Sequence, residues 1–398
     1  MVEAKDGGLP VDAVAWLMTG QEGYGVLRAV TTLAGGLKRA GVRVDALVLE
    51  DGPAVDAAES TGMGVKVLGV GVPPNYAGGV GAKAAGVVKA WAYRRRVLPA
   101  VASGLSELGS GVLQVLWPNL LGLAGAAAER AGARGRVRCV WEMANTVSSG
   151  LPLGLNGRLY RRACRRYGVL VLANSAHSGA SVAGPGVEPV TFHLGVDREV
   201  FDPGAVEAVS RLELGVPEGA VVLGVVGRLV GSKGQDRLWE AVVRHVGRGA
   251  DLHLVLLGGP TDGEFAERLR AVAASAGVAD RLHLVGLVDE PQRYYGLMDV
   301  AVNSRVDAEP FGLSVVEALM MGVPMLVHAL GGPAETVSDG VTGWHITDPS
   351  VDAFEAGLER VLAERERWPA MGRAARAEAV RRFSVEAQVE RYFAALRV

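Results

Sequence analysis

The sequence predicts an α/β protein with two doubly wound parallel sheets, one after the other along the chain. Short apolar runs alternate with amphipathic helical stretches, which is the pattern of parallel strands covered by helices. This alternation breaks once, near residue 195, and then starts again. The 398 residues exceed one ordinary domain of about 100–200 residues, and their 49% hydrophobic content is enough for two cores.

The first half begins with the apolar run VDAVAWLM, which we expect to be a buried strand. After the loop TGQEGYG, apolar residues recur at spacings of three and four, which predicts a helix. These residues are Val26, Ala29, Val30, Leu33 and Leu37. The strand VRVDALVLE follows, and the same rhythm continues. The further expected strands of this half are VKVLGV, VLQVLW, VRCVW, VLVLANS and EPVTFH.

The break is the stretch GVDREVFDPGAVEAVSRLELGVP, which contains Pro, Gly and charged residues but no strand pattern. We therefore expect a first domain over residues 1–195, a linker over 196–210 and a second domain over 211–380. The last residues, 381–398, are expected to form a helix that packs back on the first domain. The expected strands of the second half are AVVLGVVGRL, LHLVLLGG, LHLVGLV, VAVNS, PMLVHA and WHIT.

Charge and cysteine content exclude some classes of protein. Residues 1–195 contain 20 Lys and Arg against 13 Asp and Glu, whereas residues 196–398 contain 21 against 30. No domain-wide basic excess with interleaved aromatic residues appears, so nucleic acid is not an expected partner. Cys139 and Cys164 stand outside any CxxC or His-rich cluster, so neither a zinc site nor a disulfide framework is expected.

Targeting signals are also not apparent. The N-terminal residues lack the basic start and apolar core of a signal peptide. The most apolar long stretch, 112–128, includes Gln114, Pro118 and Asn119, which favours a strand, a turn and a helix over a membrane span. We expect a soluble, cytoplasmic protein.

The stretch EPFGLSVVEALMMGVPMLVHALGGPAETVSDGVTGW, residues 309–344, carries the most chemical information. We expect a helix over about 314–321, capped by Ser314 or its neighbour, because Pro310 keeps Glu309 extended. The free amides at such a helix start suit a phosphate. Glu317, near the first turn, could reach ribose hydroxyls, or it could simply stabilise the helix dipole.

Upstream, the stretch VVGRLVGSKGQDRLWEAV places two cations at a strand-to-helix turn. Arg228 and Lys233 flank a glycine-containing turn after the strand that ends at Gly227. Two cations at such a turn suit a diphosphate, although they could also be solvated charges on an exposed loop.

Taken together, these stretches resemble the family-4 retaining glycosyltransferases, also known as glycosyl transferases group 1, which have the GT-B fold. The family pattern is a GR-x4-KG turn, an E-x7-E element and a GGxxE segment. The chain has Gly227–Arg228 with Lys233–Gly234, then Glu309 with Glu317, then Gly331, Gly332 and Glu335. The resemblance implies two Rossmann-like domains, with the acceptor on the first and a nucleotide-sugar donor on the second.

This resemblance also implies residue roles. Arg228 and Lys233 would neutralise the donor diphosphate and the charge that develops on the leaving group. Glu309 would bind hydroxyls of the transferred sugar, and Glu317 would bind ribose. The other implied donor contacts are the amides of Phe311, Gly312 and Leu313 with sugar and phosphate, Leu287 and Val288 with the nucleobase, and Gly23, Tyr24 and Gly25 with phosphate.

The implied chemistry is transfer with retention at the anomeric carbon. The acceptor attacks from the same face, and the departing phosphate takes its proton, so positioning and charge stabilisation provide the catalysis. We expect no cofactor apart from the donor, a UDP- or GDP-linked sugar. The implied chemistry requires no metal, and the sequence agrees with this, since it contains no D-x-D motif or clustered His/Asp ligand set.

The chain departs from the family pattern in its first half. Many relatives place a His at the end of a strand near the transferred sugar, but the corresponding segment, VRCVWEMANTVSSG, has none. Glu142 could serve there as an acceptor-binding group or base, and Asn145 could hold a sugar hydroxyl, or both could be ordinary polar residues at a strand end. Trp117 could stack on a sugar or pack in the core. His193 is more consistent with a structural role.

Two basic stretches in the first half suggest an anionic surface as a partner. GRLYRRACRRYG, 157–168, has five arginines and no acid, and KAWAYRRR, 89–96, adds four cations. These residues could contact anionic lipid at the inner face of the membrane or a phosphorylated acceptor, or they could be solvated helix faces. The acceptor class stays open among small metabolites, polysaccharides, lipids and natural products.

Two alternative functions remain at this point. The chain could be another GT-B enzyme, such as a phosphorylase or a nucleotide-sugar epimerase. It could also be a degenerate member that binds a nucleotide sugar without transfer, which the missing His favours and the complete donor-side set opposes.

Overall fold

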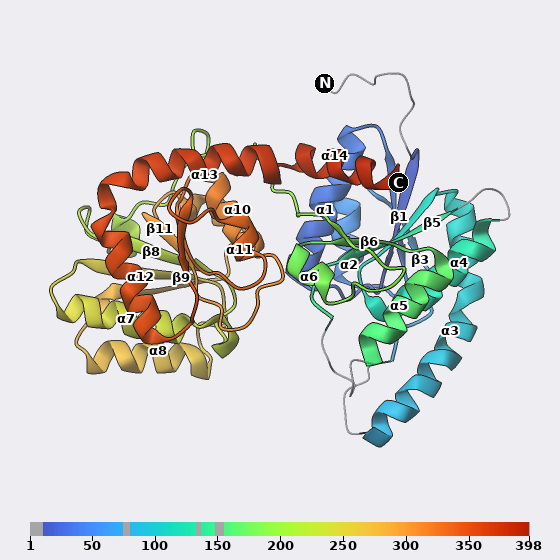
Figure 1. Cartoon of the computed structure of the whole chain (residues 1–398), viewed down its shortest axis with the longest axis horizontal. Helices are drawn as coiled ribbons and strands as arrows, with labels where there is room; N and C mark the ends of the chain where they lie inside the picture. The colour runs from blue at the N-terminus through green and yellow to red at the C-terminus, as the bar shows by residue number, and fades with distance from the viewer. Residues whose placement is uncertain (1–10, 75–79, 133–136, 148–154, 398) are drawn as a thin grey trace. The chain divides into compact units, whose positions relative to one another are not determined.

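Every apolar run expected to be a strand contains one in the computed structural model, which describes residues 11–74, 80–132, 137–147 and 155–397 (Figure 1). The strands form two sheets, one from each half of the chain, and all pairs of neighbouring strands are parallel. The central strands of both sheets are buried along their whole length, which explains why they are apolar runs rather than alternating patterns. The strands at residues 64–67, 190–191 and 282–286 are more exposed.

The first sheet has the strand order β3-β2-β1-β4-β5-β6-β7. The chain builds outward from β1 to β3 and then returns to the other side of β1 at β4, so the topology switches between β1 and β4. Ligands of such sheets bind outside the carboxyl ends of the strands at this switch. The strands are β1 (Ala13–Met18), β2 (Arg43–Val48), β3 (Gly64–Val67), β4 (Val112–Val115), β5 (Arg138–Met143), β6 (Leu170–Ala173) and β7 (Val190–Thr191).

Helices cover both faces of the first sheet. Within β1, Ala15 and Leu17 face one apolar cluster, and Trp16 and Met18 face the other, as the two-residue period of a strand requires. The first cluster includes α3 (Val80–Leu108), α4 (Leu121–Ala131) and α5 (Leu155–Tyr167), and the second includes α1 (Tyr24–Arg39), α2 (Pro53–Ser60) and α14 (Val385–Leu396). The short helix α6 (Ala176–Ala180) follows β6.

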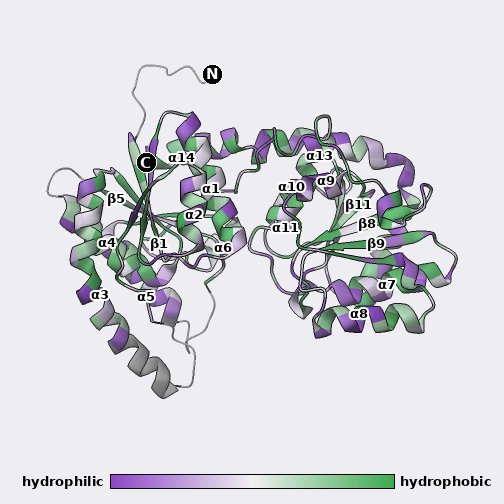
Figure 2. Ribbon diagram, turned by 180° about the vertical axis from the view of Figure 1, so that it is seen from behind, coloured by the Kyte–Doolittle hydropathy of each residue, from purple (hydrophilic) through white to green (hydrophobic). Residues whose placement is uncertain are grey.

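The second sheet has the order β10-β9-β8-β11-β12-β13 and switches between β8 and β11. Its strands are β8 (Val221–Val226), β9 (Leu252–Leu257), β10 (Leu282–Gly286), β11 (Val300–Asn303), β12 (Met325–His328) and β13 (Gly343–Ile346). Its helices are α7 (Gln235–Gly247), α8 (Glu264–Ser275), α9 (Pro291–Tyr295), α10 (Leu313–Met320), α11 (Pro333–Thr336), α12 (Val351–Ala363) and α13 (Trp368–Phe383). Figure 2 shows the hydrophobic character of the strands in both sheets.

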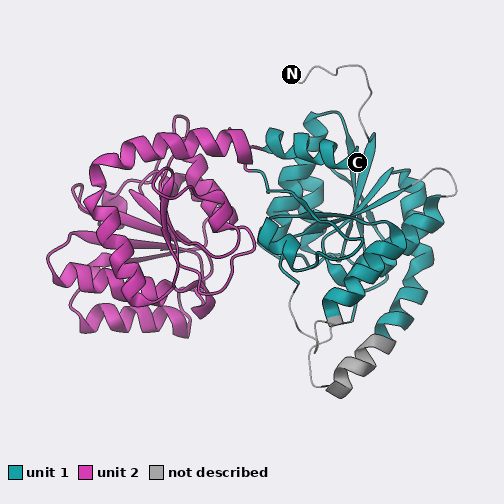
Figure 3. Cartoon of the chain, viewed as in Figure 1, with its two compact units in different colours: residues 1–195, 385–398 teal, residues 196–384 magenta. Residues whose placement is uncertain are grey.

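The chain divides into two compact units (Figure 3). Unit 1 comprises residues 1–195 and 385–398, and unit 2 comprises residues 196–384. Helix α14 is therefore part of unit 1. It packs on α1 at Gly36, where a Cβ atom would lie only 2.4 Å from the Cγ1 atom of Val385 and 2.9 Å from the Cγ2 atom of Val389.

Candidate active site

Three motif segments meet at one edge of the second sheet. Strands β8, β11 and β12 are parallel and adjacent through β11, so their carboxyl ends share this edge. The segment with Arg228 and Lys233 follows β8, the segment with Glu309 follows β11, and the segment with Gly331 follows β12. The parallel arrangement thus brings together residues that are about 100 positions apart in the sequence.

The backbone of Glu309 is fixed by the glycine pair after β12. Its N–H donates to the carbonyl oxygen of Leu330 at 3.2 Å, and its own carbonyl accepts from the N–H of Gly332 at 2.8 Å. Gly331 has a φ of +86°, and a Cβ there would lie 2.2 Å from the carbonyl oxygen of Glu309. The glycine pair is therefore needed for the strand-like contact that holds Glu309 in place.

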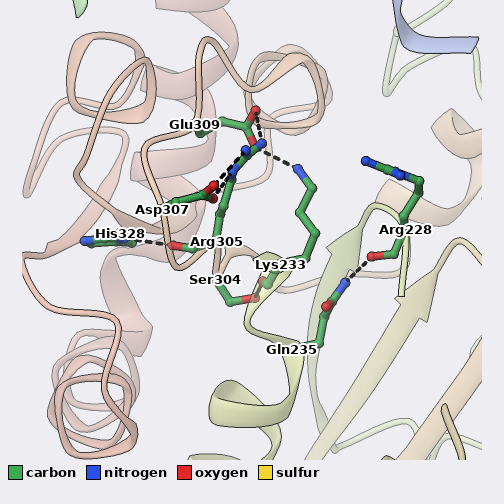
Figure 4. A network of polar contacts seen from close by, with 8 residues as sticks. All are labelled: Arg228, Lys233, Gln235, Ser304, Arg305, Asp307, Glu309 and His328. Carbon is green, nitrogen blue, oxygen red and sulfur yellow. Dashed lines mark hydrogen bonds and ion pairs between the residues drawn. The ribbon is translucent and has the colours of Figure 1, made fainter. Parts of the chain in front are cut away.

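The side chain of Glu309 accepts from two cations (Figure 4). Lys233 Nζ donates to Oε2 at 2.8 Å, and Arg305 Nη1 donates to Oε1 at 3.1 Å. Arg305 also contacts Asp307, through Nε at 2.6 Å and Nη2 at 3.3 Å. Each oxygen of the Glu309 carboxylate is thus bound by one cation.

These contacts also affect proton affinity. The hydrogen bond from Arg305 holds the pKa of Asp307 below its usual range. Partial burial opposes the charge of Arg305, but its hydrogen bond with Asp307 and the charge of Glu309 outweigh this effect and raise the pKa of Arg305. The Arg305–Asp307 pair is therefore firmly ionised.

The turn that carries Lys233 is attached to the loop after β11. Gly231–Lys233 form one 3₁₀ turn, and Gly234 follows with a φ of +66°. The Ser304 hydroxyl donates to the carbonyl of Lys233 at 2.7 Å. A Cβ at Gly234 would lie 2.1 Å from the carbonyl oxygen of Ser304, so only glycine permits this approach.

Arg228 follows β8 and is exposed. Its backbone carbonyl accepts a 2.8 Å hydrogen bond from the buried amide of Gln235, which fixes the start of the turn. Figure 4 shows its side chain on the same side of the turn as Lys233. Among the residues that the structure describes, no acid forms an ion pair with the Arg228 guanidinium, which leaves it available to an anion.

Helix α10 begins one residue earlier than predicted and has a different cap. Its N-cap is Gly312, with a φ of +87°, and no side chain caps it, so the predicted cap by Ser314 or its neighbour is wrong. The left-handed Gly312 and the buried Phe311 direct the chain into the helix without help from a hydroxyl group. The amides at this start, including that of Leu313, have no acceptor within the helix and suit an anion.

Glu317 is the fifth residue of α10, directly after its first turn, and its side chain is buried. Tyr295 Oη donates to Glu317 Oε2 at 3.0 Å and also contacts the carbonyl of Ser314 at 3.1 Å. Sequence reasoning missed Tyr295, which comes from α9. This contact orients the carboxyl group.

Leu287 and Val288 follow β10, on the opposite side of β8 from the Glu309 loop. Leu287 is 86% exposed, although it is apolar, while Val288 is half-buried. Leu287 lies near Gly259, which is the second residue after β9. An exposed apolar side chain at the carboxyl edge of a sheet is suited to contact with a flat apolar group such as a base.

In unit 1, Gly23, Tyr24 and Gly25 are exposed. Only Gly23, the N-cap of α1, precedes the helix, and the prediction that all three lie on the loop is wrong for Tyr24 and Gly25, which are its first two residues. A Cβ at either glycine would meet nothing within 4 Å, so the backbone is open to a ligand. The neighbouring Glu22, which sequence reasoning missed, is buried and holds the loop. Its Oε1 accepts from the Thr19 backbone N–H at 2.6 Å and its Oε2 from the Gly20 N–H at 3.0 Å.

Trp117 is tied to this loop, since its indole Nε1 donates to Glu22 Oε1 at 3.1 Å. The same residue lines a cavity of about 160 Å³ in unit 1. Asn145, which is exposed, lines the same cavity, together with Trp141 and Tyr160. Trp117 therefore packs against a polar loop partner and also contributes to the wall of a cavity.

Glu142 does not join these residues. Its side chain is buried within unit 1, where it accepts a short hydrogen bond from Gln114 Nε2. Gln114 in turn accepts from Tyr392 Oη of α14 at 2.6 Å. Burial raises the pKa of Glu142, and the hydrogen bond from Gln114 opposes this only in part. Its place is thus among core residues, and its role in transfer stays a prediction.

Throughout the described residues, no helix has both the length and the apolar content needed to cross a bilayer.

Comparison with known sequences places unit 2 in a family. Residues 207–378 match the model of the family described as glycosyl transferases group 1. The chain is 32% identical over 298 residues to the GDP-mannose-dependent alpha-(1-6)-phosphatidylinositol monomannoside mannosyltransferase of Mycolicibacterium smegmatis, which covers 70% of this chain and 75% of that protein. It is 34% identical over 202 residues to a D-inositol 3-phosphate glycosyltransferase of Kribbella flavida, across 48% and 47% of the two chains.

Solved structures agree on the fold. The structure of Anabaena Alr3699/HepE in complex with UDP aligns with a TM-score of 0.79 over 97% of this chain and 99% of that chain, at 19% identity. A glycosyltransferase from Rickettsia africae aligns with the same TM-score at 15% identity, over 97% of each chain. These alignments concern the fold alone. With the sequence matches, they establish that the chain belongs to the glycosyl transferases group 1 family, as a retaining, nucleotide-sugar-dependent glycosyltransferase of GT-B fold.

Proposed function

We propose that the protein transfers a hexose from a GDP-linked donor, bound by unit 2, to a hydroxyl group of an anionic acceptor, bound by unit 1. The observation that carries this proposal is the cluster of Arg228, Lys233 and Glu309 at the carboxyl edge of β8, β11 and β12. Two cations and a carboxylate at a topological switch are suited to a diphosphate joined to a polyhydroxylated ring.

Each residue has a distinct task in this proposal. Arg228 and Lys233 bind the diphosphate, Glu309 accepts hydrogen bonds from sugar hydroxyls, and the first amides of α10 bind phosphate oxygens. Glu317 binds the ribose, the glycines at 23 and 25 let the backbone approach phosphate, and Leu287 and Val288 contact the base. When the ion pair between Lys233 and Glu309 opens, Lys233 can bind the diphosphate of the donor and Glu309 can bind its sugar.

Chemically, the bond between the anomeric carbon and the β-phosphate oxygen breaks while the acceptor oxygen bonds to the same face of that carbon. The acceptor proton passes to the departing phosphate oxygen. The negative charge that develops on the leaving diphosphate is stabilised by Arg228 and Lys233. No residue of the site needs to act as a nucleophile in this scheme.

A GDP-linked donor is favoured by the relative that aligns over 70% of this chain, whose name specifies GDP-mannose. UDP is the alternative, since the Anabaena protein of similar fold was solved with UDP. The base contacts in question, Leu287 and Val288, are apolar and do not by themselves select a purine or a pyrimidine.

An anionic acceptor is supported by the basic helices of unit 1. On α5, the exposed Arg158 and Arg162 flank Leu159, which is 48% exposed. On α3, Trp91 is 58% exposed, and the Arg95 guanidinium lies 4.6 Å from its ring centre. Cations beside exposed apolar side chains are suited to the interface of an anionic bilayer, and we propose peripheral membrane contact at this face.

The donor assignment is tested by calorimetric titration of GDP, UDP, ADP and dTDP. We expect GDP to bind at least tenfold more tightly than the others, which corresponds to about 1.4 kcal/mol. K233M should weaken GDP binding by about tenfold or more because it removes a phosphate ligand. R270M is the matched control, since Arg270 lies on α8 and forms an ion pair with Glu267 of the same helix. Failure of all four nucleotides to bind would contradict the proposal.

Membrane contact is tested by sedimentation with vesicles of phosphatidylglycerol or phosphatidylcholine. We expect binding to the anionic vesicles at low salt, and its loss in R158E/R162E, since each basic residue near such a surface contributes about 1 kcal/mol. The charge-matched control R268E/R270E, on α8 of unit 2, should bind as the unmodified protein does. Equal sedimentation with and without vesicles at low salt would refute membrane contact.

A further inference from the structure

Arg305 is a cation at the centre of the site that has no role in the proposed function so far. Its guanidinium bridges two carboxylates: Nε and Nη2 contact Asp307 at 2.6 and 3.3 Å, and Nη1 contacts Glu309 at 3.1 Å. The motif that revealed the site does not include it. The side chain is only 21% exposed, and Figure 4 shows it extended alongside Lys233, with both cations directed at Glu309.

The backbone of Arg305 is held as firmly as its side chain. Its carbonyl oxygen forms a 2.7 Å hydrogen bond with Nδ1 of His328, a buried residue at the end of β12. On either side, the Ser304 hydroxyl donates to the Lys233 carbonyl at 2.7 Å, and the Val306 N–H donates to the Ser232 carbonyl at 3.0 Å. Arg305 is therefore held at both ends, since His328 fixes its backbone carbonyl and Asp307 fixes its guanidinium.

The two cations on Glu309 differ in their freedom to move. Lys233 holds Oε2 through a single ammonium at the end of a flexible stem, while Arg305 presents a planar fork that is already bound to Asp307 on one edge. A diphosphate carries more negative charge than one carboxylate, so it competes for the ammonium. The guanidinium, fixed to Asp307, stays where it is.

We propose that Arg305 is a positioning residue that keeps Glu309 paired with a cation and correctly oriented when Lys233 turns to the donor diphosphate. This proposal rests on the roles proposed above for Lys233 and Glu309. Without Arg305, Glu309 would lose both cations once the donor is bound, and a largely buried carboxylate without a partner is costly. Arg305 thus acts on the sugar through Glu309, and Asp307 acts through Arg305.

The proposal predicts which half of the donor is affected. We would measure, by calorimetry, the Kd of GDP and of GDP-mannose, and of UDP and UDP-glucose, and use the pair that binds more tightly. R305M should leave the Kd of the nucleoside diphosphate within about threefold, because the phosphate ligands remain. The gain in affinity from the sugar should disappear, and turnover of the donor should fall by up to roughly a hundredfold, as for misplacement of a substrate that a positioning group holds.

Two further variants separate positioning from folding. R305K keeps the charge but loses the fork, and we expect turnover between that of R305M and the unmodified protein. D307N loosens the guanidinium from outside the site, and because Asp307 is 62% exposed, this change should be tolerated. D307N should lower turnover by about three- to tenfold, with the nucleoside diphosphate Kd unchanged. It keeps the proposal testable even where R305M unfolds.

Two results would overturn the proposal. The first is that R305M and D307N, like R270M, keep the normal gain in affinity from the sugar and the normal turnover of the donor. The second is an equal loss of nucleoside diphosphate and nucleotide-sugar binding in R305M, which would make Arg305 a phosphate ligand instead. K233M and E309Q, measured in parallel, isolate the underlying function. If they bind and turn over the donor normally, the proposed function fails; if only R305M and D307N are normal, the role of Arg305 alone fails.

Discussion

At the scale of single residues, glycines decide whether the motif loops can approach one another. Gly331 and Gly340 both have left-handed backbones, with φ of +86° and +72°. A Cβ at Gly331 would lie 2.2 Å from the carbonyl oxygen of Glu309, whereas a Cβ at Gly340 would meet only the far end of Arg360, at 3.7 Å. Replacement of either glycine would therefore strain the backbone, but only at Gly331 would the new Cβ also clash with another part of the chain.

This difference gives a matched test. Ala at either position should cost about 1–2 kcal/mol of stability, because an L-residue is disfavoured in the left-handed region. Only G331A should also displace Glu309 and reduce donor turnover by about tenfold or more, since misplacement of a binding group is costly. Thermal melts and turnover of both variants check this. Equal turnover in G331A and G340A would show that Glu309 is not held by the glycine pair.

The residue scale also marks where sequence reasoning stopped. Arg228, Lys233, Glu309 and Glu317 became candidates because their order and spacing resemble the family pattern, and their roles stay predictions. Arg305 could not be found in this way, since its importance depends on contact with Asp307 and Glu309 after the loop has folded. Nor could the position of Glu142 be anticipated: a strand-end location does not reveal whether a helix far along the chain covers it.

At the scale of elements, the strands were predictable because a buried parallel strand is an apolar run whatever its neighbours are. The start of α10 was less so, since a left-handed Gly312 replaced the expected hydroxyl cap. Cross-strand contacts were not predictable at all. His253 of β9 and His283 of β10 stack with ring centres 5.2 Å apart, and His253 Nδ1 lies 2.9 Å from His283 Nε2.

The protonation of this pair is fixed by its partners. Arg281 donates to His253 Nε2 at 2.9 Å, so Nδ1 of His253 carries the proton and donates to His283. Burial lowers the pKa of His253 to about 4, with the charges of Arg281 and His283 acting in the same direction and Asp251 and Asp280 opposing them. Burial also lowers the pKa of His283. Both rings are neutral at pH 7.

The pair therefore predicts acid sensitivity of unit 2. The unfolded chain binds protons on these rings near pH 6.5, while folded His253 does so only near pH 4, so stability falls as pH drops through this window. The expected slope reaches about 1.4 kcal/mol per pH unit for one proton. H253Q does not titrate and should flatten the dependence. Urea unfolding between pH 4 and 7 checks this, and identical pH profiles would contradict it.

At the scale of the whole molecule, unit 1 is assembled from two distant parts of the chain. The side chains of Val385, Val389 and Tyr392 belong to the same core cluster as Leu33 and Leu37 of α1. Further along α14, Arg138 Nη1 of β5 donates to the carbonyl of Leu396 at 2.6 Å. The last helix therefore completes a core that begins near residue 11.

Removal of residues 385–398 should accordingly destabilise unit 1 and spare unit 2. Loss of a buried aromatic side chain alone typically costs about 3–5 kcal/mol. Hydrogen exchange should show faster exchange in β1, β4 and β5 and little change in β8 and β9. Y392F, which keeps the ring and loses only the bond to Gln114, should cost about 1 kcal/mol. Faster exchange in β8 and β9 alone would contradict this assignment.

Because unit 1 is built from two separate stretches of the chain, the order of synthesis affects how it folds. On the ribosome, residues 196–384 emerge with all of their own core partners before α14 leaves the exit tunnel. Unit 1, although its first strand is made earliest, lacks the α14 side chains that cover α1 until the whole of α14, which ends at Leu396, has left the tunnel. The nascent chain should therefore complete its second unit before its first, and the earlier unit is the one that needs protection by chaperones in the interval.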